Sequence, residues 1–218
     1  MKSKIILTAF ASLFFMSGAF AQIPVEIFAG HKKTSFDLMF FKYFKNKEAT
    51  NSKFLFFNRN RVSIDYKQTT TTYLPTFGFT EAVSYNQPKL KGFAPVVVAQ
   101  VNNKGIFPKA GIQFFKREND FTFFSWVVCE TLKNPNLDLF ILTRYEPKLT
   151  EKLNLFTQLE LVNAFPTEGN ANYNLFQRVR VGLKIKDWQF GAGADFNEFG
   201  NQTFTNTNNI GGFLRHEF

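Results

Sequence analysis

Apolar and polar residues alternate along several long segments of this chain. From Tyr173 to Lys186 the odd positions are mostly apolar, whereas the even positions are mostly polar or charged. The same two-residue period runs from Leu153 to Asn163 and from Trp188 to Phe196. Helical spacing fits none of these segments, and a period of two is the side-chain repeat of a β-strand with one apolar face. The pattern therefore predicts three long β-strands.

Further strands are indicated more coarsely by apolar runs that lie between turn-forming clusters. Asn, Gly, Pro and charged residues gather between these runs, as they do in turns. Many of the segments have about ten residues or more, the length that a tilted strand needs to cross a bilayer. We expect these strands near 24–30, 34–44, 52–66, 74–84, 91–102, 106–116, 121–130, 137–147 and 209–218.

Together these segments predict an all-β fold, an antiparallel up-and-down transmembrane β-barrel of about twelve strands. In hydrocarbon every backbone polar group needs a partner, and a closed sheet supplies one for each. In the C-terminal half, the connections at 131–136, 164–172 and 199–208 are expected to be longer than those at 148–152 and 186–187. The N-terminal half lacks this alternation, so a count of about ten strands also fits.

The first residues have the layout of a secretory signal peptide. Two lysines precede an apolar run from Ile5 to Phe15, and an Ala-Phe-Ala cleavage site ends at Ala21. The apolar run is too short to span a bilayer as a helix. We expect cleavage between Ala21 and Gln22, so that the chain divides into a signal peptide (1–21) and one barrel domain (22–218).

Composition supports a membrane barrel but leaves a soluble alternative. The chain has 31 Phe, 2 Trp and 6 Tyr, yet no stretch after the signal peptide is apolar for long enough to form a spanning helix. A secreted soluble β-sandwich that binds a ligand shows the same alternation with its apolar faces inward. The polar faces favour the barrel, because they carry Arg, Asn, Gln and Gly more than the Lys, Glu and Thr of a solvent face.

In a barrel the polar faces point into the lumen, because Arg or Lys on the lipid side costs about 2–4 kcal/mol at mid-depth. Glu160, Arg178, Arg180 and Asp195 lie on adjacent predicted strands and are expected to pair across the sheet. One interpretation is a structural charge network that fills a narrow lumen. The other is a basic constriction that selects anions. The predicted inward charges are Arg59, Arg61, Asp65, Asp138, Arg144, Glu160, Arg178, Arg180, Lys184, Asp195, Arg215 and Glu217.

The inventory of reactive side chains argues against an enzyme. His31 and His216 are the chain's two histidines and Cys129 is its one cysteine, so neither a serine–histidine–acid set nor a metal-ligand cluster is indicated. We expect no cofactor and no metal. The net charge of +9, less two lysines of the signal peptide, leaves +7 on the mature chain. For an exported protein this charge favours lipopolysaccharide or an anionic solute over nucleic acid as partner.

The end of the chain carries a resemblance. Its last predicted strand alternates and closes on Phe218, which resembles the terminal signal of outer-membrane barrels. With Phe54–Arg59 and Phe213–Phe218, the mature chain is similar to small outer-membrane β-barrel proteins of Bacteroidota, most of them uncharacterised. This resemblance implies export to the outer membrane of a Gram-negative bacterium, contact with outer-membrane lipid, and assembly by the barrel assembly machinery with Phe218 as signal. A weaker resemblance, to twelve-stranded nucleoside-specific channels, rests on strand number and aromatic content.

Three functions remain open at this stage. The first is a small porin-like channel for small solutes, including anionic ones. The second is a barrel with a filled lumen in a structural or adhesive role. The third is the soluble β-sandwich that binds a ligand. In none of the three does the sequence identify the solute or ligand.

Overall fold

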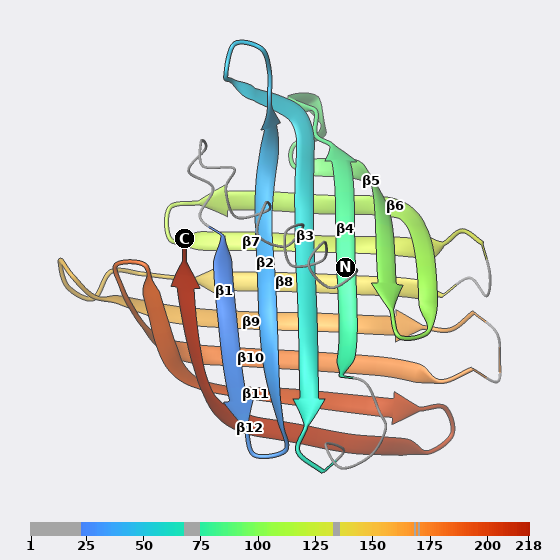
Figure 1. Cartoon of the computed structure of the whole chain (residues 1–218). Coiled ribbons are helices and arrows are strands. Elements are labelled where there is room, and N and C mark those ends of the chain that lie inside the picture. The colour runs from blue at the N-terminus through green and yellow to red at the C-terminus, as the bar shows by residue number, and fades with distance from the viewer. Residues whose placement is uncertain (1–22, 68–74, 133–135, 168, 170) are drawn as a thin grey trace, which may run out of the picture.

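The computed structural model describes residues 23–67, 75–132, 136–167, 169 and 171–218, and these form twelve antiparallel strands (Figure 1). The predicted signal peptide, with Ala21 and Gln22, lies outside the described residues. A short 3-10 helix, η1 (Pro88–Leu90), precedes β5. The strands are β1 (Pro24–Gly30), β2 (Lys33–Lys45), β3 (Asn51–Asp65), β4 (Thr76–Tyr85), β5 (Phe93–Asn102), β6 (Gly105–Glu118), β7 (Phe121–Glu130), β8 (Leu137–Tyr145), β9 (Asn154–Phe165), β10 (Tyr173–Ile185), β11 (Trp188–Gly200) and β12 (Phe204–Glu217).

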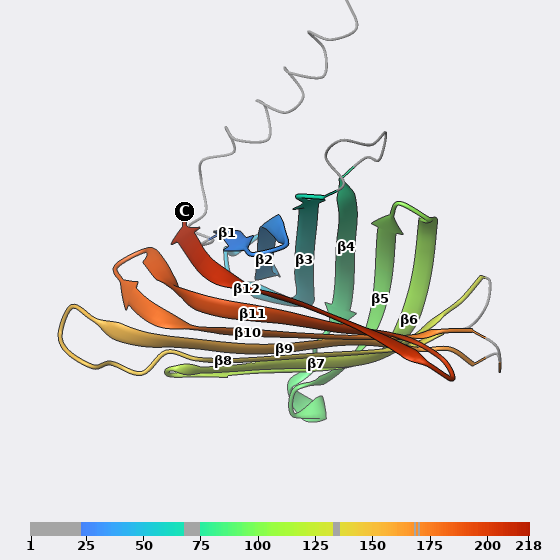
Figure 2. The ribbon, with the colours of Figure 1, turned by 90° about the horizontal axis from the view of Figure 1, so that it is seen from below.

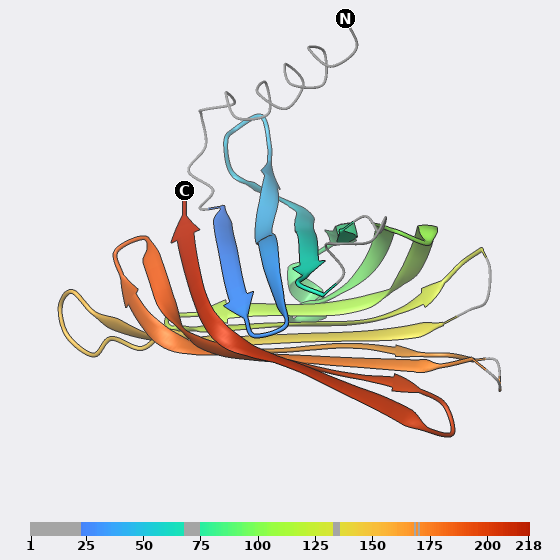
Figure 3. The same cartoon turned by 60° about the horizontal axis from the view of Figure 1, so that its bottom comes forward.

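The strands close into a single barrel. Each strand pairs with its neighbours in sequence, and β1 pairs with β12 from Pro24↔Glu217 to Gly30↔Gly211. Figure 3 shows β12 beside β1 across this seam. The predicted fold class and strand count are confirmed, and the count of about ten is wrong. A two-sheet sandwich is also wrong, because the β1–β12 pairing joins the sheet to itself.

Connection lengths do not distinguish the two ends of the barrel. The connection expected at 199–208 is reduced to residues 201–203, because Phe204–Asn208 continue β12 and pair with β11 from Phe196 to Gly200. The connection expected to be short at 148–152 extends over residues 146–153. The Asn and Thr residues before position 209 resemble a turn in sequence, but their backbone groups complete the β11–β12 ladder.

The barrel wall is strongly tilted, and strands on opposite walls cross. In Figure 1, β2–β5 run nearly at right angles to β7–β9, and Figure 2 shows the same crossing from below. β12 bends at its C-terminal end and runs beside β1. Tilts of this kind are needed to close a sheet into a barrel. We call the end that holds Pro24 and Glu217 the terminal end, and the opposite end, which holds the β1–β2 and β11–β12 turns, the far end.

The outer face of the wall is apolar and exposed. Val97, Ile112 and Val181 point outward with exposures of 61%, 61% and 49%. Similar outward positions recur around the barrel, for example at Ile27 and Leu214. Exposed apolar surface of this extent is rare on soluble monomers and is the outward band of a membrane barrel. Among the described residues no helix is long and apolar enough to cross a membrane.

The interior has two different halves. One half, on β1–β3 and β9–β12, is lined by buried charges. The other half is packed with apolar side chains from β2–β8, so the prediction of a polar inner face holds for only part of the wall. We call this second group the aromatic cluster; its members are Met39, Phe57, Ala82, Val96, Val98, Phe124, Trp126, Val128, Phe140 and Leu142.

Candidate functional site in the barrel lumen

A network of arginines and carboxylates fills the charged half of the lumen. Strand pairing brings the first members together, because Arg178 on β10 lies opposite Glu160 on β9 and Asp195 on β11. The other members reach it from across the barrel. We call this group the lumen network; it consists of Arg59, Arg61, Arg178 and Arg180 with Glu26, Asp37, Glu160 and Asp195. Arg215 lies at its edge, 4.0 Å from Glu26 Oε2.

Asp37 accepts hydrogen bonds from three arginines of the network. Its Oδ2 lies 3.2 Å from Arg59 Nη2, 2.7 Å from Arg61 Nη2 and 2.5 Å from Arg178 Nη1. Glu160 faces the same guanidinium groups: its Oε1 is 2.5 Å from Arg59 Nη2, and its Oε2 is 4.0 Å from Arg178 Nη1. Three arginines thus meet two buried carboxylates, and Asp195, whose Oδ1 lies 3.2 Å from Arg178 Nε, supplies the third negative charge.

Arg180 is fully buried beside this pair. Its Nε donates to Glu26 Oε1 at 3.0 Å, its Nη1 donates to Asp195 Oδ1 at 2.9 Å, and its guanidinium carbon stands 3.9 Å from the centroid of the Phe28 ring. Gly193 is paired with Arg180 on the neighbouring strand β11, and a Cβ at Gly193 would lie 2.7 Å from Arg180 Cδ. The arginine side chain therefore occupies space that a side chain at position 193 would take.

Because of this network, the central arginines do not act as unpaired positive charges in the lumen. Arg178 and Arg180, which the second interpretation of the sequence places in a basic constriction, each have carboxylates within 4.0 Å on more than one side. Removing one partner from such a buried set leaves an uncompensated charge, which costs about 3–5 kcal/mol. The arrangement therefore acts as a fixed, neutralised layer between opposite walls.

The remaining predicted charges also lie on the inner face, but outside this layer. Lys184 binds Glu217 at 2.8 Å, and Lys109 pairs with Asp138. Asp65 accepts a hydrogen bond from the backbone N–H of Lys67 at 2.9 Å. These contacts occur near the two rims of the barrel; Lys184 on β10 reaches β12 and Lys109 on β6 reaches β8, each across the strand between them, whereas the Asp65 contact is local.

The charged residues of the lumen that were not predicted from sequence include Glu26, Asp37 and Lys109. Glu26 and Asp37 belong to the network, and Lys109 holds Asp138. A signal was present for Asp37, which alternates with Phe36 and Leu38, and for Glu26, which alternates with Val25 and Ile27. Their partners lie far away in sequence, since Arg178 is 141 residues from Asp37.

Arg144 and Arg215 form a second, less balanced pair. Nε and Nη2 of Arg144 donate to Gln158 Oε1 at 3.2 and 3.0 Å, and Nη1 of Arg215 donates to the same oxygen at 3.0 Å. The guanidinium carbons of both arginines also approach the Phe156 ring, at 5.8 and 5.4 Å from its centroid. The shared acceptor is a neutral amide, so it cannot cancel either charge.

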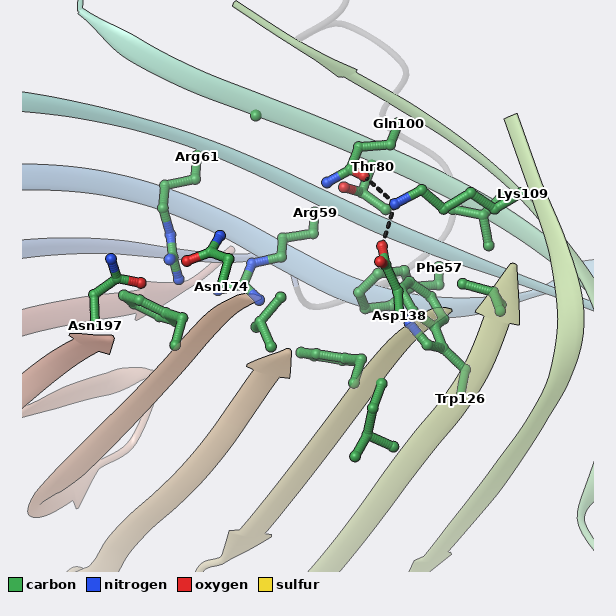
Figure 4. A pocket seen from close by; sticks show the side chains of 17 residues that line it. Phe57, Arg59, Arg61, Thr80, Gln100, Lys109, Trp126, Asp138, Asn174 and Asn197 are labelled. Carbon is green, nitrogen blue, oxygen red and sulfur yellow. Dashed lines mark hydrogen bonds and ion pairs between the residues drawn. The ribbon is translucent and has the colours of Figure 1, made fainter. Parts of the chain in front are cut away.

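Two cavities enter the lumen from opposite ends. The far-end cavity has a volume of about 260 Å³ and is bordered by Arg61, Asn174 and Asn197, with Trp126 in its apolar wall (Figure 4). The terminal-end cavity has a volume of about 890 Å³ and is lined by basic residues, including Arg144, and by aromatic rings. The two linings share no residue, so side chains separate the cavities.

Phe124 stands at this separation. Its ring is 5.2 Å from that of Phe57, which lines the far-end cavity, and 4.8 Å from that of Phe41, which lines the terminal-end cavity. Phe124 is itself completely buried and borders neither cavity. The two cavities therefore approach each other through the aromatic cluster.

The reactive residues considered from sequence lie away from these cavities. Cys129 is a free thiol on the outer face of β7. His31 accepts a hydrogen bond from the backbone N–H of Ile210 at the β1–β2 turn, and His216 packs against Trp188 on the outside. Within the ranges that the structure describes, no three His, Cys, Asp or Glu side chains are grouped to hold a metal ion.

Comparison with known proteins bears on the fold. No family model matches the chain, and no curated protein sequence matches it. A solved KdgM porin in complex with disordered oligogalacturonate is 13% identical over 91% of this chain and 99% of that chain, with a TM-score of 0.50. A second KdgM porin structure is 14% identical over the same shares, with a TM-score of 0.48. The chain therefore has the fold of porin-type outer-membrane barrels.

A third solved structure is less similar to this chain. The translocator domain of the autotransporter NalP from Neisseria meningitidis is 8% identical over 100% of this chain and 95% of that chain, with a TM-score of 0.35. Identities this low concern the fold and not the activity. The function must therefore be argued from the lumen of this chain.

Proposed function

We propose that this chain is an outer-membrane porin-like barrel that passes small solutes along the aromatic half of its lumen. The observation that carries the proposal is the pair of cavities that enter from opposite ends and converge on Phe124. A solute that crosses must displace this ring and its neighbours. The charged half offers no such route, because Arg178 and Arg180 at its centre are buried and each is ion-paired to more than one carboxylate.

The location rests on the outer surface and the fold. The exposed apolar belt suits the hydrocarbon of a bilayer, and the expected signal peptide would deliver the mature chain across the inner membrane. We place the terminal end in the periplasm, in line with the proposed assembly signal at Phe218. In this orientation the larger, basic cavity opens toward the periplasm and the smaller one toward the outside.

The second candidate function is a barrel with a filled lumen that serves a structural or adhesive role. It is favoured by the completely buried side chains at mid-lumen, among them Glu160, Arg180 and Phe124. The two candidates differ in whether the aromatic cluster moves. They do not differ in fold or location.

Conductance of the refolded full chain in planar bilayers separates the candidates. A channel should show discrete, infrequent openings, and Phe124→Ala should raise their frequency or size because it joins the two cavities. Phe156→Ala is the matched control, since Phe156 is equally buried but belongs to another cluster. If wild type and both variants are silent, the filled-lumen function replaces the channel.

A further inference from the structure

The shared acceptor at Gln158 leaves positive charge without a protein partner. Among the described residues no carboxylate lies within 4.0 Å of the guanidinium of Arg144. Arg215 has a single one, Glu26 Oε2 at 4.0 Å, and the other oxygen of that carboxylate is bound by Arg180 at 3.0 Å. Nε of Arg215 is buried and has no hydrogen-bond partner in the described part of the chain.

The two acids that act most on Arg144, Glu146 and Glu217, are already engaged. Lys184 Nζ donates to Glu146 Oε1 at 3.4 Å and to Glu217 Oε2 at 2.8 Å, and Gln189 donates to Glu217 Oε1 at 2.7 Å. Two like charges that meet at one neutral oxygen repel each other, and the repulsion is stronger in a low-dielectric interior than in water. Arg144 and Arg215 therefore differ from Arg178 and Arg180, whose charges are balanced.

An anion can reach this pair from solvent. Arg144 lines the terminal-end cavity, and the same lining includes Lys45, Lys91 and Arg117. Lys116 also lines it but pairs with Glu118 at 3.1 Å. The excess of cations along the cavity attracts anions and raises their local concentration.

We propose that Arg144, with Arg215 behind it, binds a small oxyanion that enters through the terminal-end cavity. The group recognised is a carboxylate, phosphate or sulfate, because a planar guanidinium donates two parallel hydrogen bonds to two oxygens. Gln158 is a positioning residue that holds both guanidinium groups through its Oε1. Binding at this site does not require conduction, so it can be tested independently of the proposed channel.

Isothermal titration calorimetry on the refolded full chain in detergent tests the site, with sodium sulfate added at constant ionic strength. Wild type should bind sulfate saturably, and Arg144→Gln should weaken binding by about tenfold or more, the effect of losing charge-assisted hydrogen bonds. Lys148→Gln removes an exposed cation at the same end and should change binding by less than about twofold. Equal affinity of wild type and Arg144→Gln would overturn the proposal, as would a wild type that does not bind.

A second variant guards against misfolding. Gln158→Glu places a carboxylate of nearly the same shape between the two guanidinium groups, so it should abolish sulfate binding and raise the midpoint of thermal unfolding. Retained binding in this variant contradicts the proposal. Repeating the titration with phosphate and acetate identifies which oxyanion is preferred. A barrel that binds sulfate but never conducts keeps this inference and rejects the channel.

Discussion

Replacing Asp37 by Asn tests whether the lumen network holds the barrel together. Asp37 Oδ2 is within 3.2 Å of nitrogen atoms from Arg59, Arg61 and Arg178. Asn keeps the size of the side chain but removes the negative charge. Its amide N–H₂ group would also face the N–H groups of the three arginines, which cannot accept a hydrogen bond. Loss of one partner from a buried ion network costs about 3–5 kcal/mol, which lowers the folding equilibrium constant by about two to four orders of magnitude.

The matched control is Asp65→Asn, which makes the same chemical change at the rim of the same face. Asp65 bonds the backbone of Lys67 and has no ion-pair partner within 4.0 Å among the described residues, so this variant should lose about 0.5 kcal/mol or less. Urea unfolding of refolded protein in lipid vesicles, followed by tryptophan fluorescence, gives the free energy of unfolding of each. If the two variants lose the same amount, the network does not stabilise the barrel and the reasoning fails.

Two further predictions concern the lipid face and the chain end. Val181→Arg should lower the free energy of unfolding in bilayers by about 2–4 kcal/mol, because Val181 points outward on β10 with 49% exposure. Val181→Leu is the control. If both variants lose the same free energy, Val181 does not face lipid. Deleting Phe218, whose backbone pairs with Ile23 at 3.0 and 3.1 Å, should lower outer-membrane levels in cells without blocking export across the inner membrane. Unchanged levels on cell fractionation would count against an assembly signal at Phe218.

The strand pattern was readable from sequence because each strand lies between two different environments. Alternation at Tyr173–Ile185 separates Arg178 and Arg180 from Val179 and Val181, and the structure buries the first pair and places Val181 on the outside. Alternation assigns residues to a face within a strand. It does not say which residues meet across the lumen, so the contact between Asp37 and Arg178 could not be predicted from the sequence.

The aromatic cluster could not be predicted for a related reason. Phe54 to Phe57 are apolar on both faces of β3, because the outer side meets lipid and the inner side meets other rings. A continuous apolar run carries no period that assigns an inside. The expectation of a polar inner face came from strands such as β10 and failed where inner positions are apolar, as at Phe57 on β3 and Phe124 on β7.

The two halves of the lumen also differ in what it costs to move them. A ring pair such as Phe124–Phe57 contributes about 0.5–1.5 kcal/mol beyond its burial, and a ring that rotates in place can re-form contacts with its neighbours. An arginine pulled from the lumen network leaves buried carboxylates uncompensated, at a cost of about 3–5 kcal/mol. Opening along the aromatic half leaves no buried charge without a partner, whereas opening along the charged half does. Because both cavities end against that half, the network serves best as the fixed wall against which a solute path opens.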